Sequence, residues 1–270
     1  MPPLSPLLSE LAADARLMLL GTLAAATLML VLWLIHFPMR NASIVDPGWA
    51  TGLALIALLF AFLAPGYPKR VWLLTSMVVI WGVRLAVYLL FNRVLGHPEE
   101  GRYVELRRQW KTNVEFKFLL FFEAQALLCG FLSLPFAIVA NDQAPGLGFF
   151  EYTGVVVWVI AIVGELAADA QLAAFKRNPA NKGKVCAVGL WRYSRHPNYF
   201  FEWLIWMAYA IFAFPSPLGL LAMLCPALML FFLFRITGIP ATEAQGLRSR
   251  GDAYREYQRT TSVFFPWFPK

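Results

Sequence analysis

The chain has 270 residues, of which 59% are hydrophobic and 14% are charged, and its mean hydropathy is +0.59. This composition supplies too little polar surface to cover a soluble globule of that length, so the chain is expected in lipid. The formal net charge is +7. The basic residues flank apolar segments and no recognition motif accompanies them, which argues against nucleic acid as a partner.

Seven apolar segments are each close to the ~20 helical residues that cross a hydrocarbon core. They are residues 17–37, 47–64, 71–91, 116–140, 152–175, 198–214 and 217–236. We therefore predict an all-α, polytopic membrane protein of about seven transmembrane helices. The second and sixth segments are short, so five or six true spans with re-entrant pieces are the alternative.

The basic residues are distributed unevenly between the two sets of loops. Of the 23 Lys and Arg residues, about 19 lie after the first, third and fifth segments or in the C-terminal tail, and about three lie in the N-terminus and the other loops. The positive-inside rule then places the C-terminus in the cytoplasm and the N-terminus outside. Glu10 and Asp14 precede the first segment where a signal peptide would be basic, so the first helix is expected to be retained.

No linker is long enough to separate two domains, so residues 1–270 are expected to form one. Two of the three cysteines, Cys129 and Cys225, lie inside apolar segments, and Cys186 lies in a loop. This scatter predicts neither a disulfide framework nor a metal site.

The third segment carries a polar face in an otherwise apolar helix. Trp81, Arg84, Tyr88 and Asn92 follow one another at helical spacing. An ionisable group inside a span costs several kcal/mol, so Arg84 indicates either a lined cavity or a buried structural ion pair. Asp46 stands where the second segment begins and is either a helix cap or a group that faces the same cavity.

The fifth segment repeats this pattern near its cytoplasmic end. Glu165, Asp169 and Lys176 share one helix face, together with Leu172. Lys176 lies near the helix end, from which its long side chain can extend the ammonium group to the membrane surface. Glu165 lies deeper, and this explanation does not apply to it. The face is therefore a second candidate for a binding site.

The sixth segment opens with Arg195-His196-Pro197-Asn198-Tyr199, and proline suits the first helical position. A helix N-terminus surrounded by cations binds anions well, and anionic lipid headgroups are the alternative to a specific ligand. The cations expected there are Lys182, Lys184, Arg192, Arg195 and His196.

Residues 189–202, which read Gly-Leu-Trp-Arg-Tyr-Ser-Arg-His-Pro-Asn-Tyr-Phe-Phe-Glu, resemble the signature of membrane sterol and steroid reductases. Asp169, Lys176, the third-segment residues and the tail 251–266 extend the likeness to the bacterial branch of the steroid 5α-reductase family. The resemblance implies a bacterial inner-membrane enzyme that uses NADPH without a Rossmann domain. It divides the chain into substrate-side helices, 1–140, and cofactor-side helices with the tail, 150–270.

The resemblance implies that the nucleotide lies at the cytoplasmic end, where its phosphates need cations and its ribose and amide need donors and acceptors. Carried over to this chain, the cofactor-binding residues are Asn92, Arg93, Glu165, Asp169, Lys176, Lys184, Tyr193, Arg195, His196, Asn198 and Glu202. Neither a metal nor an obligate protein partner is expected.

The implied reaction is hydride transfer to the β-carbon of an enone that enters from the bilayer, such as a Δ4-3-keto steroid. A donor must polarise the carbonyl, and a protonated Asp46 carboxyl is the candidate. Trp81 stands where steroid reductases have a tyrosine. An indole donates a hydrogen bond but does not release a proton as a phenol does, so Tyr88 is the candidate proton donor, with Arg84 beside it.

Two other functions compete with this one. Isoprenylcysteine-type carboxyl methyltransferases, which use S-adenosylmethionine, share an Arg-His-Pro-x-Tyr motif and an acidic residue like Glu243. That family has glycine where this chain has Phe201. A non-catalytic sterol or lipid carrier is the third hypothesis, in which the polar groups only shape a pocket.

Overall fold

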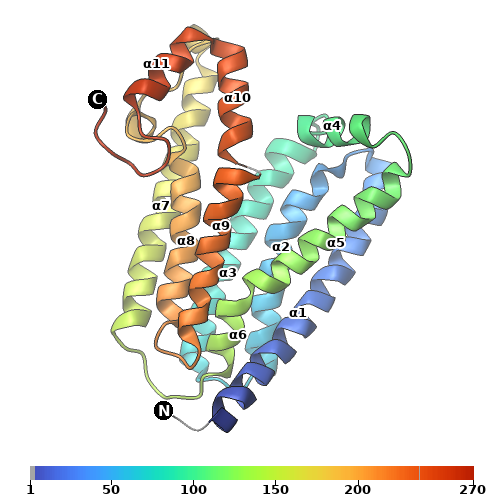
Figure 1. Cartoon of the computed structure of the whole chain (residues 1–270), viewed down its shortest axis with the longest axis vertical. Coiled ribbons are helices and arrows are strands. Elements are labelled where there is room, and N and C mark those ends of the chain that lie inside the picture. The colour runs from blue at the N-terminus through green and yellow to red at the C-terminus, as the bar shows by residue number, and fades with distance from the viewer. Residues whose placement is uncertain (1–3, 237) are drawn as a thin grey trace. The chain divides into compact units, whose positions relative to one another are not determined.

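The computed structural model describes residues 4–236 and 238–270, and the described residues form helices and loops without a β-strand. Figure 1 shows the helices in chain order. The α-helices are α1 (Leu4–Met39), α2 (Val45–Leu63), α3 (Pro68–Leu89), α4 (Gly101–Trp110), α5 (Val114–Leu132), α6 (Leu134–Asn141), α7 (Phe149–Arg177), α8 (Pro197–Ala213), α9 (Leu224–Arg235), α10 (Ile239–Arg250) and α11 (Asp252–Thr260). The all-α prediction is confirmed.

Among the described residues, five helical stretches are long and apolar enough to cross a membrane, and a sixth is added if the bent pair α5 and α6 counts as one span. All seven predicted segments coincide with helices, but α8 has 17 residues, fewer than the ~20 that a span takes. The multi-pass membrane character is therefore supported, while the orientation of the termini stays a prediction.

Two predicted continuous helices are interrupted. The segment 116–140 bends by 40° between α5 and α6, beside Pro135, which has no N–H to donate to the preceding turn. The C-terminal end of α3 continues as a π-helical turn, Leu90–Val94, in which the Leu95 N–H donates to the Leu90 carbonyl at 2.8 Å. This wider turn changes the register of Asn92 relative to Trp81, so the expected α-helical spacing along the face ends at Leu89.

The chain divides into two compact units. The first comprises Met1–Glu151 and Ala213–Ala222, and the second comprises Tyr152–Phe212 and Met223–Lys270. In the first unit, α1 packs against α2, α5 and α6, and α2 packs against α3. Small residues allow these close approaches: a Cβ added at Gly82 of α3 would lie 2.8 Å from the Ala50 carbonyl oxygen of α2.

Ion pairs, some of them buried, connect helix ends in the first unit. The Arg70 side chain is 7% exposed, and it donates from Nε to Glu151 at 2.8 Å and lies 3.0 Å from Asp142. At the end of α1, the His36 ring lies 2.8 Å from Glu115, which also accepts from Arg107 at 2.9 Å. These contacts fix the ends of helices that are apolar along most of their length.

In the second unit, two glycines of α7 face α8. A Cβ at Gly164 would meet the Phe201 ring at 2.3 Å, and one at Gly154 would meet Phe212 at 2.8 Å. The backbone of α8 approaches α7 directly at Gly154, whereas the Phe201 ring occupies the space that Gly164 leaves open. Helix α8 begins at Pro197, as the sequence predicts, and it carries the candidate residues that follow this proline.

Candidate functional site

The predicted site residues fall in both units, and each unit is described by itself. The first holds the four predicted substrate-side residues together with Asn92 and Arg93, and the second holds all the other predicted cofactor residues. Asn92 and Arg93, which were assigned to the cofactor, therefore belong to the same unit as the substrate-side groups.

In the first unit, Asp46 lies in the first turn of α2 and contacts α4. Its Oδ1 accepts a hydrogen bond from the Tyr103 hydroxyl at 2.7 Å, and its Oδ2 forms an ion pair with Arg102. Burial, reinforced by the Asp46 charge, raises the pKa of the Tyr103 phenol well above its usual range, so the hydroxyl remains a donor. The N-cap of α2 is Ile44, so capping does not explain Asp46. Both carboxylate oxygens of Asp46 therefore have partners on α4.

The polar face of α3 consists of Trp81, Arg84 and Tyr88. Trp81 is fully buried, and its ring lies edge-on to Trp49 with centroids 5.8 Å apart. Arg84 and Tyr88 are half-buried. In the π-helical turn, the Asn92 amide donates to the Tyr88 carbonyl at 2.8 Å.

In the second unit, α7 and α8 bring together two predicted cofactor residues that are 29 positions apart. The Asn198 amide donates to Asp169 at 3.3 Å. One turn further along α8, Glu202 accepts from the Trp206 indole at 3.1 Å. Glu165 is buried on α7. This pair of helices thus presents amide and carboxylate groups side by side near the start of α8.

The loop between these helices is fixed on α7 by Gln171. The Leu190 N–H donates to the Gln171 side-chain oxygen at 2.8 Å, and the Trp191 indole donates to the Ala168 carbonyl at 2.9 Å. Gly189 adopts a φ of +56°, and a Cβ there would lie 2.4 Å from the Gln171 oxygen. A side chain at position 189 would therefore displace the loop that leads into the Arg195-His196-Pro197 turn.

A cavity of about 130 Å³ lies between the end of α7, the following loop and the end of α10. It contains two of the predicted cofactor residues, Lys176 and Lys184. Of the described residues that line it, four carry a cationic side chain and none carries an acidic one. The lining residues are Leu172, Phe175, Lys176, Asn181, Lys182, Gly183, Lys184, Cys186 and Arg250. Such a cavity attracts a polyanion.

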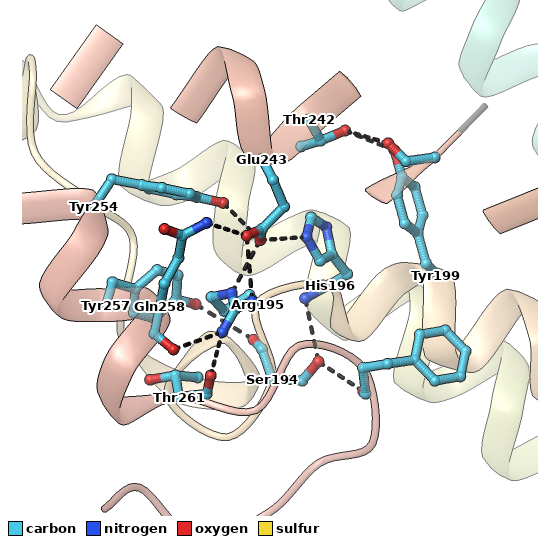
Figure 2. A network of polar contacts seen from close by, with 12 residues as sticks. Ser194, Arg195, His196, Tyr199, Thr242, Glu243, Tyr254, Tyr257, Gln258 and Thr261 are labelled. Atoms are coloured by element: carbon cyan, nitrogen blue, oxygen red, sulfur yellow. Dashed lines mark hydrogen bonds and ion pairs between the residues drawn. The ribbon is translucent and has the colours of Figure 1, made fainter. Parts of the chain in front are cut away.

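Arg195 and His196 contact Glu243 of α10, as Figure 2 shows. Glu243 accepts from Arg195 Nε at 2.9 Å and lies 2.9 Å from His196 Nε2. Arg195 also donates to the Thr261 carbonyl at 2.6 Å. Arg195 and His196 thereby hold the opening of α8 to the C-terminal helices, and their assignment to the nucleotide stays a prediction.

Two further side chains from α11 complete this group around Glu243. The Tyr254 hydroxyl donates to Glu243 at 3.1 Å, and the Gln258 amide also donates to it. Burial, followed by the charge of Glu243, raises the pKa of Tyr254 to about 12. We call the five residues Arg195, His196, Glu243, Tyr254 and Gln258 the Glu243 cluster.

A family model described as a protein of unknown function, DUF1295, matches residues 32–261. The chain belongs to the DUF1295 family. An uncharacterized protein of Schizosaccharomyces pombe is 25% identical over 282 aligned positions, which cover 91% of this chain and 78% of the relative. A probable O-methyltransferase of Ustilaginoidea virens, ustE, is 40% identical over 47 residues, or 17% of this chain and 16% of that protein. No solved structure matches.

Several residues of this DUF1295 chain that contact the candidate groups were not singled out from the sequence. Tyr103 and Arg102 approach Asp46 from α4, which lies between two of the predicted apolar segments, and Gln171 holds the loop before α8. Arg250 lines the cationic cavity and donates to the Lys184 carbonyl at 2.9 Å. Of these residues, only Arg250 could have been singled out from the sequence, because it lies close to another basic residue, Arg248, at the end of α10.

Among the described residues, no group of three or more His, Cys, Asp or Glu side chains is arranged to hold a metal ion.

Proposed function

We propose that the chain is an NADPH-dependent membrane reductase that transfers hydride to the carbon-carbon double bond of an enone, such as a Δ4-3-keto steroid. The observation that supports this proposal best is the cavity lined by Lys176, Lys182, Lys184 and Arg250. A dinucleotide phosphate carries several negative charges, and four cations around one cavity match that chemistry.

The neighbouring polar groups suit the uncharged parts of a dinucleotide. Asp169 and Asn198 offer an acceptor and a donor within 3.3 Å of each other, and Glu202 lies one turn further along α8. Carboxylates accept hydrogen bonds from ribose hydroxyls, and amide side chains bind a carboxamide. Bound NADPH supplies the hydride, and these residues orient it.

The proposal is tested by comparing the binding of NADPH and S-adenosylmethionine to the purified protein. S-Adenosylmethionine has a sulfonium, an ammonium and a carboxylate but no phosphate, so the cationic cavity has little to attract it. We expect calorimetry to detect NADPH binding that weakens as salt rises, and no comparable binding of S-adenosylmethionine. Selective binding of S-adenosylmethionine, or retention of neither ligand, contradicts the reductase proposal.

A carboxyl or O-methyltransferase is the second candidate, because ustE is named a probable O-methyltransferase. The Glu243 cluster gives this candidate an acidic group beside the Arg195-His196 pair. Phe201 argues against this candidate, because the methyltransferase family has glycine at that position. In this chain the Phe201 ring packs directly against Gly164. Methyl transfer from labelled S-adenosylmethionine, measured beside NADPH oxidation, separates the two reactions.

At the substrate end, we propose that Asp46 and the polar face of α3 bind the enone carbonyl. Asp46, at the start of α2, is hydrogen-bonded to Tyr103 of α4. The polar face of α3 adds Trp81, Arg84 and Tyr88. A group that polarises a carbonyl acts mainly when negative charge develops on its oxygen, so it contributes to the transition state more than to cofactor binding.

Asp46→Ala is therefore expected to lower turnover by at least about 100-fold, the typical effect of removing one such electrostatic group, while the NADPH affinity changes little. Enone-dependent NADPH oxidation in nanodiscs measures the first quantity, and calorimetry measures the second. Glu105→Ala is the control, because this carboxylate is 47% exposed and its described partners, Arg108 and Gln109, lie on the same helix. Wild-type turnover in Asp46→Ala with every accepted enone excludes this role for Asp46.

A further inference from the structure

The last residues of the chain form an ordered segment with strongly exposed aromatic side chains. Phe265 is 54% exposed, Trp267 is 71% exposed and Phe268 is 76% exposed. Soluble surfaces rarely gather large aromatic side chains in this way, so such a patch marks an interaction site. We call Phe265, Trp267 and Phe268 the aromatic patch.

The backbone of this segment is held by hydrogen bonds to the body of the second unit. The Trp267 N–H donates to the Tyr193 carbonyl, and the Lys270 N–H donates to the Thr260 carbonyl, both at 2.9 Å. The Ser194 hydroxyl donates to the Phe264 carbonyl at 2.7 Å. The exposed rings therefore project from a fixed backbone, and their exposure does not come from a frayed terminus.

The patch is continuous with apolar helix surface. Phe264 is 1% exposed and packs with Leu233, in the last turn of α9, and with Ile239. Its neighbour Phe265 has its ring 5.7 Å from Phe200 and 5.8 Å from Trp203, both on α8. The tail therefore packs beside the start of α8 and the end of α9, where these apolar helices join the more polar segments next to them.

We propose that the aromatic patch inserts into the headgroup region of the bilayer and anchors the C-terminal segment on the membrane surface. Tryptophan and other amphipathic rings are enriched at this depth. Exposed cations accompany them, with Lys270 beyond the patch and Arg192 beside Tyr193, and anionic headgroups attract such cations. A membrane surface accommodates both the aromatic rings and the cations, which favours it over a protein partner.

The test places a nitroxide label at residue 267 of the full chain in nanodiscs of zwitterionic and anionic lipid. Trp267→Cys supplies the labelling site, and Asp252→Cys, whose native side chain is 93% exposed on α11, supplies a solvent-exposed control. The three native cysteines are buried, so we expect them to react little with the label. Labelling of the unsubstituted chain measures this background. Electron paramagnetic resonance then compares relaxation by oxygen, which concentrates in lipid, with relaxation by a water-soluble nickel complex.

We expect the label at 267 to be relaxed more by oxygen than by nickel, and the label at 252 to show the reverse. Equal nickel accessibility at the two positions would overturn the anchor. Protection of position 267 from both reagents would also overturn it, because that pattern indicates cover by protein. The proposal is independent of the reductase function, since no enzymatic readout enters the measurement.

Discussion

Replacing Glu243 with alanine is expected to lower the melting temperature of the protein in detergent by roughly 10 °C. The Arg195 side chain is 10% exposed and that of His196 is 2% exposed. Removing their shared carboxylate leaves a buried guanidinium without its charge partner, and such losses cost about 3–5 kcal/mol. For a chain of this size, each kcal/mol corresponds to a shift of about 2–4 °C.

Glu256→Ala is the matched control for this effect. Glu256 also pairs with an arginine, Arg259, at 2.8 Å, but the two side chains are 57% and 77% exposed. Exposed ion pairs contribute little to stability, so the control is expected to melt close to the wild type. Equal melting temperatures for Glu243→Ala and Glu256→Ala would contradict a stabilising role for the Glu243 cluster.

Features that depend on one helix alone could be predicted from the sequence. Pro197 predicts the start of α8 because proline has no N–H to leave unsatisfied at the first helical position. The apolar runs predict the long helices because a span needs a fixed length of hydrocarbon-compatible residues. Asp169 and Asn198 were both selected as cofactor residues, and the structure brings them into contact.

Contacts between distant, polar segments could not be predicted in the same way. Helix α4 has only a few apolar positions, so neither periodicity nor hydropathy indicated the helix that carries Tyr103 to Asp46. Glu243 lies 47 positions from His196, and no spacing rule connects them. The sequence therefore shows the basic side chains of Arg195 and His196 but not the carboxylate that packs against them.

The π-helical turn at the end of α3 illustrates a different limit. Asn92 was placed on the face of Trp81 by α-helical spacing, but the register changes after Leu89. Such a turn depends on how the flanking helix packs, and sequence periodicity does not encode it. The structure of that turn thus decides which side of the helix Asn92 occupies.

The double variant Lys176→Ala/Lys184→Ala is expected to weaken NADPH binding by about 100-fold at low salt. Hydrogen bonds to charged groups contribute about 1.5–3 kcal/mol each when well formed, and 1.4 kcal/mol is a factor of ten in affinity. Both lysines are exposed to solvent where they line the cavity, so we take the lower end of that range for each. The difference from the wild type is expected to shrink as the ionic strength rises.

The control variant Arg255→Ala/Arg259→Ala removes the same number of positive charges from α11. These arginines are 71% and 77% exposed and pair with Asp252 and Glu256, and neither lines the cationic cavity. Calorimetric titration of NADPH is expected to give a near wild-type affinity for this control. An equal loss in both double variants would show that the net charge of the unit, and not the cavity, attracts the nucleotide. An unchanged affinity in Lys176→Ala/Lys184→Ala would remove the cavity from the cofactor site, and with it the main support for NADPH over S-adenosylmethionine.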